Sequence, residues 1–249
     1  MTNLVRSELL KIRSTRMWWG MAAGALAFVA LSVIAQVFAS GASPGAPTLA
    51  EETGVRSVWA GAGGATVFAL VLGILGMTTE YRHQTISATF LATPRRSRVV
   101  LAKMAAHALV GLALGVACCL LAVVLSVPLL AVKDATAIPT STILSILAGA
   151  LLAMVLYAVI GVAVGALVPN QIAAILGALV WVMLVESLVV AFLPEVGRWL
   201  PGGAASAVLR ATPFRGDLLE PWAGVLVFLA YTAVFAALAT RTTLRRDVT

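Results

Sequence analysis

The sequence predicts an all-α polytopic membrane protein with six transmembrane helices. Of the 249 residues, 61% are apolar and only 11% are charged, whereas soluble domains have roughly 45–50% apolar and about 25% charged residues. The mean hydropathy is +1.03. The apolar residues would fill six or seven spans of about 20 residues each. This composition excludes a soluble globular enzyme, a disordered chain and a fibrous protein.

Six apolar runs are long enough to cross a hydrocarbon core of roughly 30 Å at about 1.5 Å per residue. They lie at about residues 17–38, 58–78, 99–131, 141–168, 171–193 and 222–240. The third and fourth runs are longer than a span requires, so we expect them to tilt or to project past the membrane, and Pro128 favours a kink. The first run exceeds the roughly 7–15 residues of a signal-peptide core, so we expect a retained span.

The basic residues predict the orientation. The side with the N-terminal segment, the 79–103 loop and the C-terminal tail carries 12 of the 17 Lys and Arg residues, and the other side carries five. The positive-inside rule therefore places both termini in the cytoplasm, as an even number of spans requires. We attribute the net charge of +7 to the membrane surface and expect no nucleic-acid partner.

Residues 1–16 predict a short interfacial helix. Val5, Leu9 and Ile12 fall on one helical face. Basic residues flank this face, namely Arg6, Lys11 and Arg13. An apolar stripe with basic flanks is typical of a helix lying on the cytoplasmic leaflet, and a frayed basic flank is the alternative.

Two segments on the opposite side are rich in Gly and Pro. Residues 39–57 predict an irregular loop. Within 194–221, the apolar stretch 204–209 is too short to span, so we expect one or two short outer helices, with a re-entrant course as one arrangement.

The cytoplasmic loop at residues 79–98 predicts a structured turn. Thr78 or Thr79 can cap a new helix, with Glu80 in its first turn, where the helix dipole favours an acid. A simple hairpin between two spans would not need such a helix.

The same loop carries an apolar patch and a second helix start. Ile86 and Phe90 are four residues apart, and Thr93-Pro94 combines a cap with proline at the first helical position. A short helix with an apolar patch suits docking onto another protein. A solvated basic loop is the alternative.

The spacing of five residues in this region resembles the first cytoplasmic loop of type-2 ATP-binding-cassette (ABC) transporter permeases. These residues are Glu80, Thr85, Pro94, Arg98 and Lys103. In that family the loop carries a coupling helix that sits in a cleft of the nucleotide-binding subunit. The resemblance extends to the basic N-terminal helix, the six spans and the short outer helices. The string Val185-Glu186, followed by residues 198–202, is similar to small bacterial members.

The resemblance implies the permease subunit of an ATP-driven exporter in a bacterial cytoplasmic membrane. A separate ABC ATPase subunit would bind ATP and Mg, and a second permease copy or a paralogue would complete the assembly within the membrane lipid. Drugs, antimicrobial peptides and lipids all fit as amphipathic substrates. The implied ATPase-coupling residues are Glu80, Tyr81, Arg82, Thr85, Ile86, Phe90, Pro94, Arg98 and Lys103.

The sequence contains no pattern for chemistry of its own. No lysine follows a glycine, so no phosphate-binding loop is present and we expect no cofactor on this chain. Two histidines and the adjacent Cys118 and Cys119 do not form a metal-site pattern. The G-x-S-x-G string at 41–45 lies in a loop without a histidine partner, so we expect no catalytic residue. A standalone carrier or channel, or a membrane scaffold or sensor, remains the alternative.

Glu186 is the one acid well inside a predicted span, roughly 10 Å from its end. An ionisable group at that depth should face protein or a water-filled path. It is a candidate gate or a contact for a cationic substrate group. The structural alternative is a partner for Arg198 or for a backbone donor in the outer helices. No second acid or lysine lies clearly within a predicted span, which argues against ion-coupled transport.

Three Gly-x-x-x-Gly pairs predict close helix approaches. They are Gly20 with Gly24, Gly111 with Gly115, and Gly161 with Gly165. Packing within the chain is one interpretation and a subunit interface is the other, for which the resemblance favours the first span.

Overall fold

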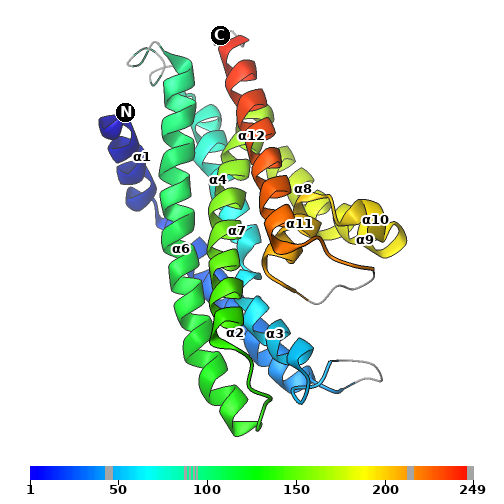
Figure 1. Ribbon diagram of the computed structural model, residues 1–249. Coiled ribbons are helices and arrows are strands. Elements are labelled where there is room, and N and C mark those ends of the chain that lie inside the picture. Colours follow the sequence, from blue (N-terminus) through cyan, green and yellow to red (C-terminus); the bar gives the residue numbers. More distant parts are fainter. Residues whose placement is uncertain are drawn as a thin grey trace.

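The computed structural model of the chain is all-helical (Figure 1). It describes residues 1–42, 47–86, 89, 91, 93, 95–211 and 216–245. Within these residues, six helical stretches are long and apolar enough to cross a membrane: Arg16–Ala39, Glu52–Arg82, Ser97–Val132, Thr140–Leu167, Gln171–Phe192 and Pro221–Arg241. The predicted all-α fold with six long apolar helices is confirmed.

Eleven α-helices and two other helical turns are present in the described part of the chain. The α-helices are α1 (Thr2–Ser14), α2 (Arg16–Ala39), α3 (Glu52–Ala60), α4 (Thr66–Arg82), α6 (Arg96–Val132), α7 (Thr140–Leu167), α8 (Gln171–Val180), α9 (Glu186–Phe192), α10 (Pro194–Gly197), α11 (Pro201–Val208) and α12 (Pro221–Arg245). A 3-10 turn, η1 (Gly61–Gly63), joins α3 to α4, and a π-helical turn, η2 (Trp181–Val185), joins α8 to α9.

The second apolar stretch differs most from the prediction. It is built from α3, η1 and α4 and extends past the predicted 58–78 range at both ends. The predicted helix start at Thr78 or Thr79 is wrong, because α4 continues through both residues to Arg82. The Thr78 hydroxyl donates to the carbonyl of Ile74 at 2.9 Å, one turn back in the same helix. A residue bonded in this way is inside a helix and cannot cap a new one.

Helix α7 lies at the centre and packs against α4, α6 and α12. Glycines make the closest approaches possible. A Cβ atom at Gly161 would collide with the carbonyl of Leu70 in α4, and one at Gly111 would lie 2.8 Å from the carbonyl of Met154 in α7. Backbones can come this near only where a side chain is missing.

The second glycine of each of these two pairs is also covered by a helix of this chain. A Cβ atom at Gly115 would lie 3.2 Å from the Cβ atom of Met154 in α7. One at Gly165 would lie 2.8 Å from the carbonyl of Ile74 in α4. The pair of Gly111 and Gly115 and the pair of Gly161 and Gly165 therefore pack within the chain, and neither offers the open face that a subunit interface requires.

The pair in the first span is different. A Cβ atom at Gly24 would collide with the ring of Phe68 in α4, whereas one at Gly20 would meet nothing within 4 Å. Gly20 is therefore the member of the three pairs that leaves its helix face open.

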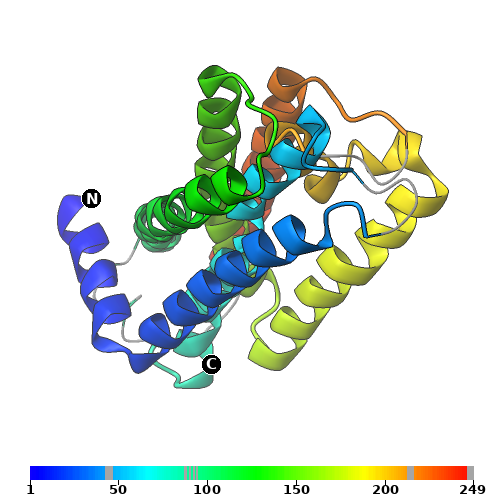
Figure 2. The same cartoon turned by 90° about the horizontal axis from the view of Figure 1, so that it is seen from below.

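Helix α1 and the end of α12 lie at the same end of the bundle, near the end of α4 and the start of α6 (Figure 1). Helices α9, α10 and α11 lie partway along the bundle, whereas α6 and α7 extend beyond them (Figure 1). Seen along the bundle, α8 and α9 form one edge (Figure 2). Their stretch, Gln171–Phe192, is the least buried of the six.

Candidate functional site

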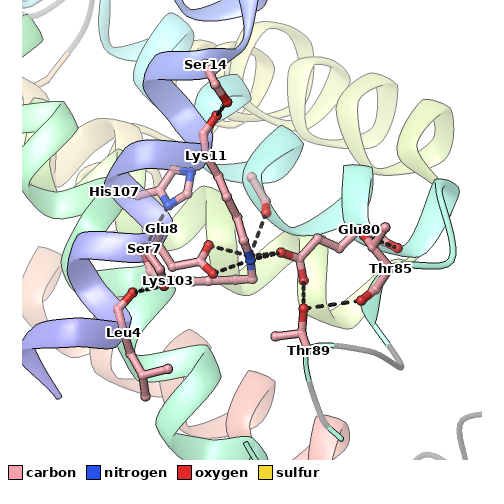
Figure 3. A network of polar contacts seen from close by, with 11 residues as sticks. Leu4, Ser7, Glu8, Lys11, Ser14, Glu80, Thr85, Thr89, Lys103 and His107 are labelled. Carbon is pink, nitrogen blue, oxygen red and sulfur yellow. Dashed lines mark hydrogen bonds and ion pairs between the residues drawn. The ribbon is translucent and has the colours of Figure 1, made fainter. Parts of the chain in front are cut away.

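A network of buried charges joins α1, α4 and α6 (Figure 3). Lys103 of α6 is at its centre, with 1% of its side chain exposed. Its Nζ atom lies 2.6 Å from a carboxylate oxygen of Glu8 in α1 and 2.7 Å from one of Glu80 in α4. It also donates to the carbonyl of Gly76 at 3.3 Å. The ammonium group of Lys103 therefore links α6 to both α1 and α4.

Lys11 balances the charge of this network. Its Nζ atom lies 2.7 Å from Glu8 and 2.8 Å from Glu80, so two lysines face two carboxylates. Burial lowers the pKa of Lys11, but its hydrogen bonds and the attraction of the two carboxylates outweigh this, and the pKa rises above its ordinary 10.5. The network is therefore neutral overall, and every charged group in it has a partner, which is the condition for keeping ions away from water.

His107 extends the network along α6. It lies four residues after Lys103, on the same helix face, and its Nδ1 donates to the carbonyl of Lys103 at 2.8 Å. The ring packs directly on Gly76 of α4, where a Cβ atom would collide with it. Glycine at this position is what allows α4 and α6 to meet around the lysine.

Helix α1 is held by its apolar face as well as by its charges. Leu9 and Ile12 pack against the hydrophobic core, and Glu8 is buried with its carboxylate on Lys103 of α6. The apolar face predicted within residues 1–16 therefore packs against the rest of this chain. Arg6 and Arg13, the predicted basic flanks, are exposed.

Helix α4 ends immediately beside the network. The amide of Thr85 donates to the carbonyl of Glu80 and that of Gln84 to Tyr81, while Gln84 has a φ of 56°. This is the Schellman arrangement, in which a left-handed residue terminates a helix. The Thr89 hydroxyl then contacts the Glu80 carboxylate at 3.5 Å, so the following segment is tied to the network.

Helical hydrogen bonding resumes after this turn. The amide of Thr89 donates to the carbonyl of Thr85, and that of Thr93 to Thr89, each four residues apart. The repeat is that of an α-helix. Phe90 and Pro94 lie outside the described residues.

Several predicted coupling residues have surroundings that the sequence did not indicate. Glu80 was expected in the first turn of a new helix, but it is buried near the end of α4. Ile86 was expected in an outward-facing apolar patch, but it is buried against Met77 and Val99. Lys103 was expected in the basic entry to the third span, and it is instead buried inside α6, which begins seven residues earlier. Each side chain finds a partner within the chain that only folding brings near.

The remaining predicted residues that the structure describes lie at the surface or near it. Arg82 and Arg98 are exposed, Tyr81 is half-buried, and Thr85 is exposed in the turn. Arg82 donates to the side chain of Gln171 at the start of α8, at 3.5 Å.

A cavity of about 600 Å³ opens beside the network. Its charged end carries Glu8, Lys11, Glu80 and Lys103, and its apolar wall is formed by Trp18, Leu72, Leu75 and Val110. The buried ionic network and an open cavity therefore lie side by side in this region.

The sequence analysis missed two members of the network, Glu8 and His107. Glu8 falls on the same face as Val5, Leu9 and Ile12, and an acid inside an apolar stripe is itself a signal for burial with a partner. No comparable local signal marks His107, since its role depends on the contact with Gly76.

Glu186 belongs to a second site. It is 3% exposed, and its two carboxylate oxygens accept hydrogen bonds from Trp181 Nε1 at 2.7 Å and from the amide of Gly202 at 2.6 Å. One of these two donors is a backbone amide of the 194–221 segment. The Arg198 guanidinium, the other partner considered for Glu186, pairs with Glu195 at 2.5 Å.

No group of three or more His, Cys, Asp or Glu side chains that could hold a metal ion occurs in the described part of the chain. No curated protein matches the sequence. The family model described as ABC-2 family transporter protein matches residues 4–186, which is well over half of the chain and includes most of α1, the ionic network, the first four apolar stretches and part of the fifth. The chain therefore belongs to the ABC-2 family of transporter membrane proteins.

Proposed function

We propose that this chain is the membrane subunit of an exporter that moves an amphipathic molecule out of the cytoplasm. As an ABC-2 permease it lacks an ATPase domain and works with a separate ATPase subunit. The outward direction and the substrate class, a drug, an antimicrobial peptide or a lipid, are the parts we add.

The ionic network carries the proposal. The segment after α4 is the one we assign to contact with the ATPase, and the Glu80 carboxylate that touches Thr89 in it also holds Lys103 and, through Lys103, Glu8. Separating buried ion pairs costs several kcal/mol. Movement of this segment would therefore displace α4, α6 and α1 together instead of bending the loop alone.

The exposed surface around the network supplies the expected contacts. We propose that this end of the bundle, which holds α1 and the end of α12, faces the cytoplasm. Arg82 and Arg98 would then face the ATPase together with Tyr81, Thr85, Phe90 and Pro94.

The rest of the proposed assembly concerns the membrane. Arg6 and Arg13 on the exposed side of α1 would lie near anionic lipid headgroups, which attract basic residues. The open face at Gly20 is the surface we assign to a second permease copy or a paralogue.

Reconstitution with the ATPase subunit tests the coupling. We expect Glu80→Gln to insert normally but to lower the amount of substrate moved per ATP hydrolysed by about tenfold or more. Glu52→Gln is the matched control, because Glu52 forms an exposed ion pair with Arg56 away from the network. Equal coupling in the two variants would remove the role of the network, and repeated purification without a stoichiometric ATPase would favour a standalone carrier or a scaffold.

A further inference from the structure

We propose that the cavity bounded by η2, α9, α10 and α11 binds the cationic group of an amphipathic molecule, with Glu186 as the anionic contact. This inference rests on the proposed transport function for its biological meaning, because it names the class of substrate. The binding itself needs neither ATP nor the ATPase.

The cavity has the size and the surface of a small-molecule site. Its volume is about 620 Å³, within the roughly 300–1,000 Å³ typical of such sites. Apolar side chains such as Leu184, Leu188, Val190 and Pro194 form most of the wall, and Glu186 is a buried charge at its edge. An apolar wall with one fixed charge suits a ligand that is itself largely apolar and carries one opposite charge.

The charge of Glu186 is not neutralised by a counter-ion in the described residues. Its two partners, the Trp181 indole and the Gly202 amide, are neutral donors. Arg198 lines the same cavity but pairs with Glu195, and Asp217 adds a second carboxylate to the wall. A buried carboxylate without a cation is costly, so a positively charged ligand would regain Coulomb energy there.

The carboxylate also has free capacity to accept hydrogen bonds. Its two oxygens offer about four acceptor sites in total, and the two neutral donors use one on each oxygen. An ammonium or guanidinium group could therefore be bound without displacing Trp181 or Gly202.

The backbone fixes this carboxylate in place before any ligand arrives. The π-helical turn η2 immediately precedes Glu186, and its wider spacing brings Trp181, five residues earlier, next to the carboxylate. At Gly202 a Cβ atom would collide with the second oxygen, so only glycine allows the amide to reach it. Such π-helical turns are frequent at functional sites, and a preset charge binds with a smaller ordering cost.

Two lipophilic ions of the same shape and opposite charge test the proposal. Tetraphenylphosphonium and tetraphenylborate would be titrated against the purified full chain in lipid nanodiscs by equilibrium dialysis, with empty nanodiscs subtracted. We expect the chain to bind tetraphenylphosphonium saturably, and we expect added tetraphenylborate not to displace it from the site. Equal competition by tetraphenylborate would overturn the proposal without any mutation.

Glu186→Gln and Glu52→Gln form a matched pair of variants. Glutamine at 186 keeps a carbonyl oxygen for the Gly202 amide and removes the charge. We expect it to weaken tetraphenylphosphonium binding at least about tenfold, because this cation has no N–H donor and is held at the site by Coulomb attraction to the carboxylate. Glu52→Gln, which removes an exposed carboxylate paired with Arg56 outside the cavity, should change it less than about twofold. Quenching of Trp181 fluorescence, identified by its loss in Trp181→Phe, reports whether the ligand is at this site.

The outcomes distinguish this inference from the transport proposal. Unchanged cation binding in Glu186→Gln, or quenching that does not depend on Trp181, refutes the site even if the complex transports other molecules. Charge-selective binding in a chain that never associates with an ATPase would support the site and refute the exporter.

Discussion

Replacing Lys103 by methionine should destabilise the fold more than any substitution at the charged surface. Methionine has a similar length and suits an apolar environment, so the main change is the loss of the ammonium group. The Glu8 and Glu80 carboxylates, which lie 2.6 and 2.7 Å from that group, would keep only Lys11, whose side chain is 49% exposed. Breaking a buried ion pair from one side costs about 3–5 kcal/mol, so we expect a loss of this size.

The assay is reversible unfolding in mixed micelles of SDS and a mild detergent, followed by far-UV circular dichroism. A double-mutant cycle with Glu80→Gln separates the pair from other effects of each change. Because Glu80→Gln already removes one of the unpaired charges, the double variant should be more stable than the sum of the single losses predicts, by about 1 kcal/mol or more.

Two results would refute the reasoning. One is a loss below about 0.5 kcal/mol for Lys103→Met, which is the range of an ordinary surface substitution. The other is strict additivity in the cycle, which would mean that the two side chains do not interact in the folded chain. Arg56→Met, which removes a cation from an exposed pair with Glu52, is the control and should cost at most about 1 kcal/mol.

Three smaller predictions concern backbone positions. Gly161→Ala should lower the unfolding free energy by more than about 1 kcal/mol, because its Cβ would collide with a carbonyl of α4, whereas Gly20→Ala should leave it nearly unchanged; equal losses in SDS unfolding would contradict this. Gln84→Gly should raise the same free energy by up to about 1 kcal/mol, since Gln84 has a φ of 56°, and a loss would argue against the left-handed turn. Gly202→Ala should displace the Glu186 carboxylate and shift the tryptophan emission spectrum, and an unchanged spectrum would show that the contact between Glu186 and Trp181 survives the added Cβ atom.

The membrane helices could be predicted because their signal is local. A run of apolar side chains crosses a bilayer wherever it occurs, so composition and run length placed five of the six stretches within a few residues of their observed ends. The second stretch was predicted too short. Its start at Glu52 and its end at Arg82 carry charges, and hydropathy cannot distinguish a charge that ends a helix from one that has a partner.

The charged residues show where local reasoning stops. Glu80 and Lys103 were both selected from a family pattern, and they were expected at a solvated helix start and in the basic entry to the third span, because a charge near the end of an apolar run is normally solvated. Their burial depends on each other and on Glu8, which is 95 residues away from Lys103 along the chain. A charge can leave water only if its partner arrives with it, and no property of one segment reveals that.

The sequence by itself determined that this membrane protein is helical, that it has six stretches long and apolar enough to span a membrane and that it contains no phosphate-binding motif, since these follow from composition, run length and missing residue types. The tertiary structure alone decided which charges are buried and what they hold. It joined α1, α4 and α6 around Lys103, and it left Glu186 with neutral donors beside a cavity while Arg198 paired with Glu195. Ion pairing requires atoms to lie within about 4 Å of each other, and only the packing of helices distant in sequence sets those distances.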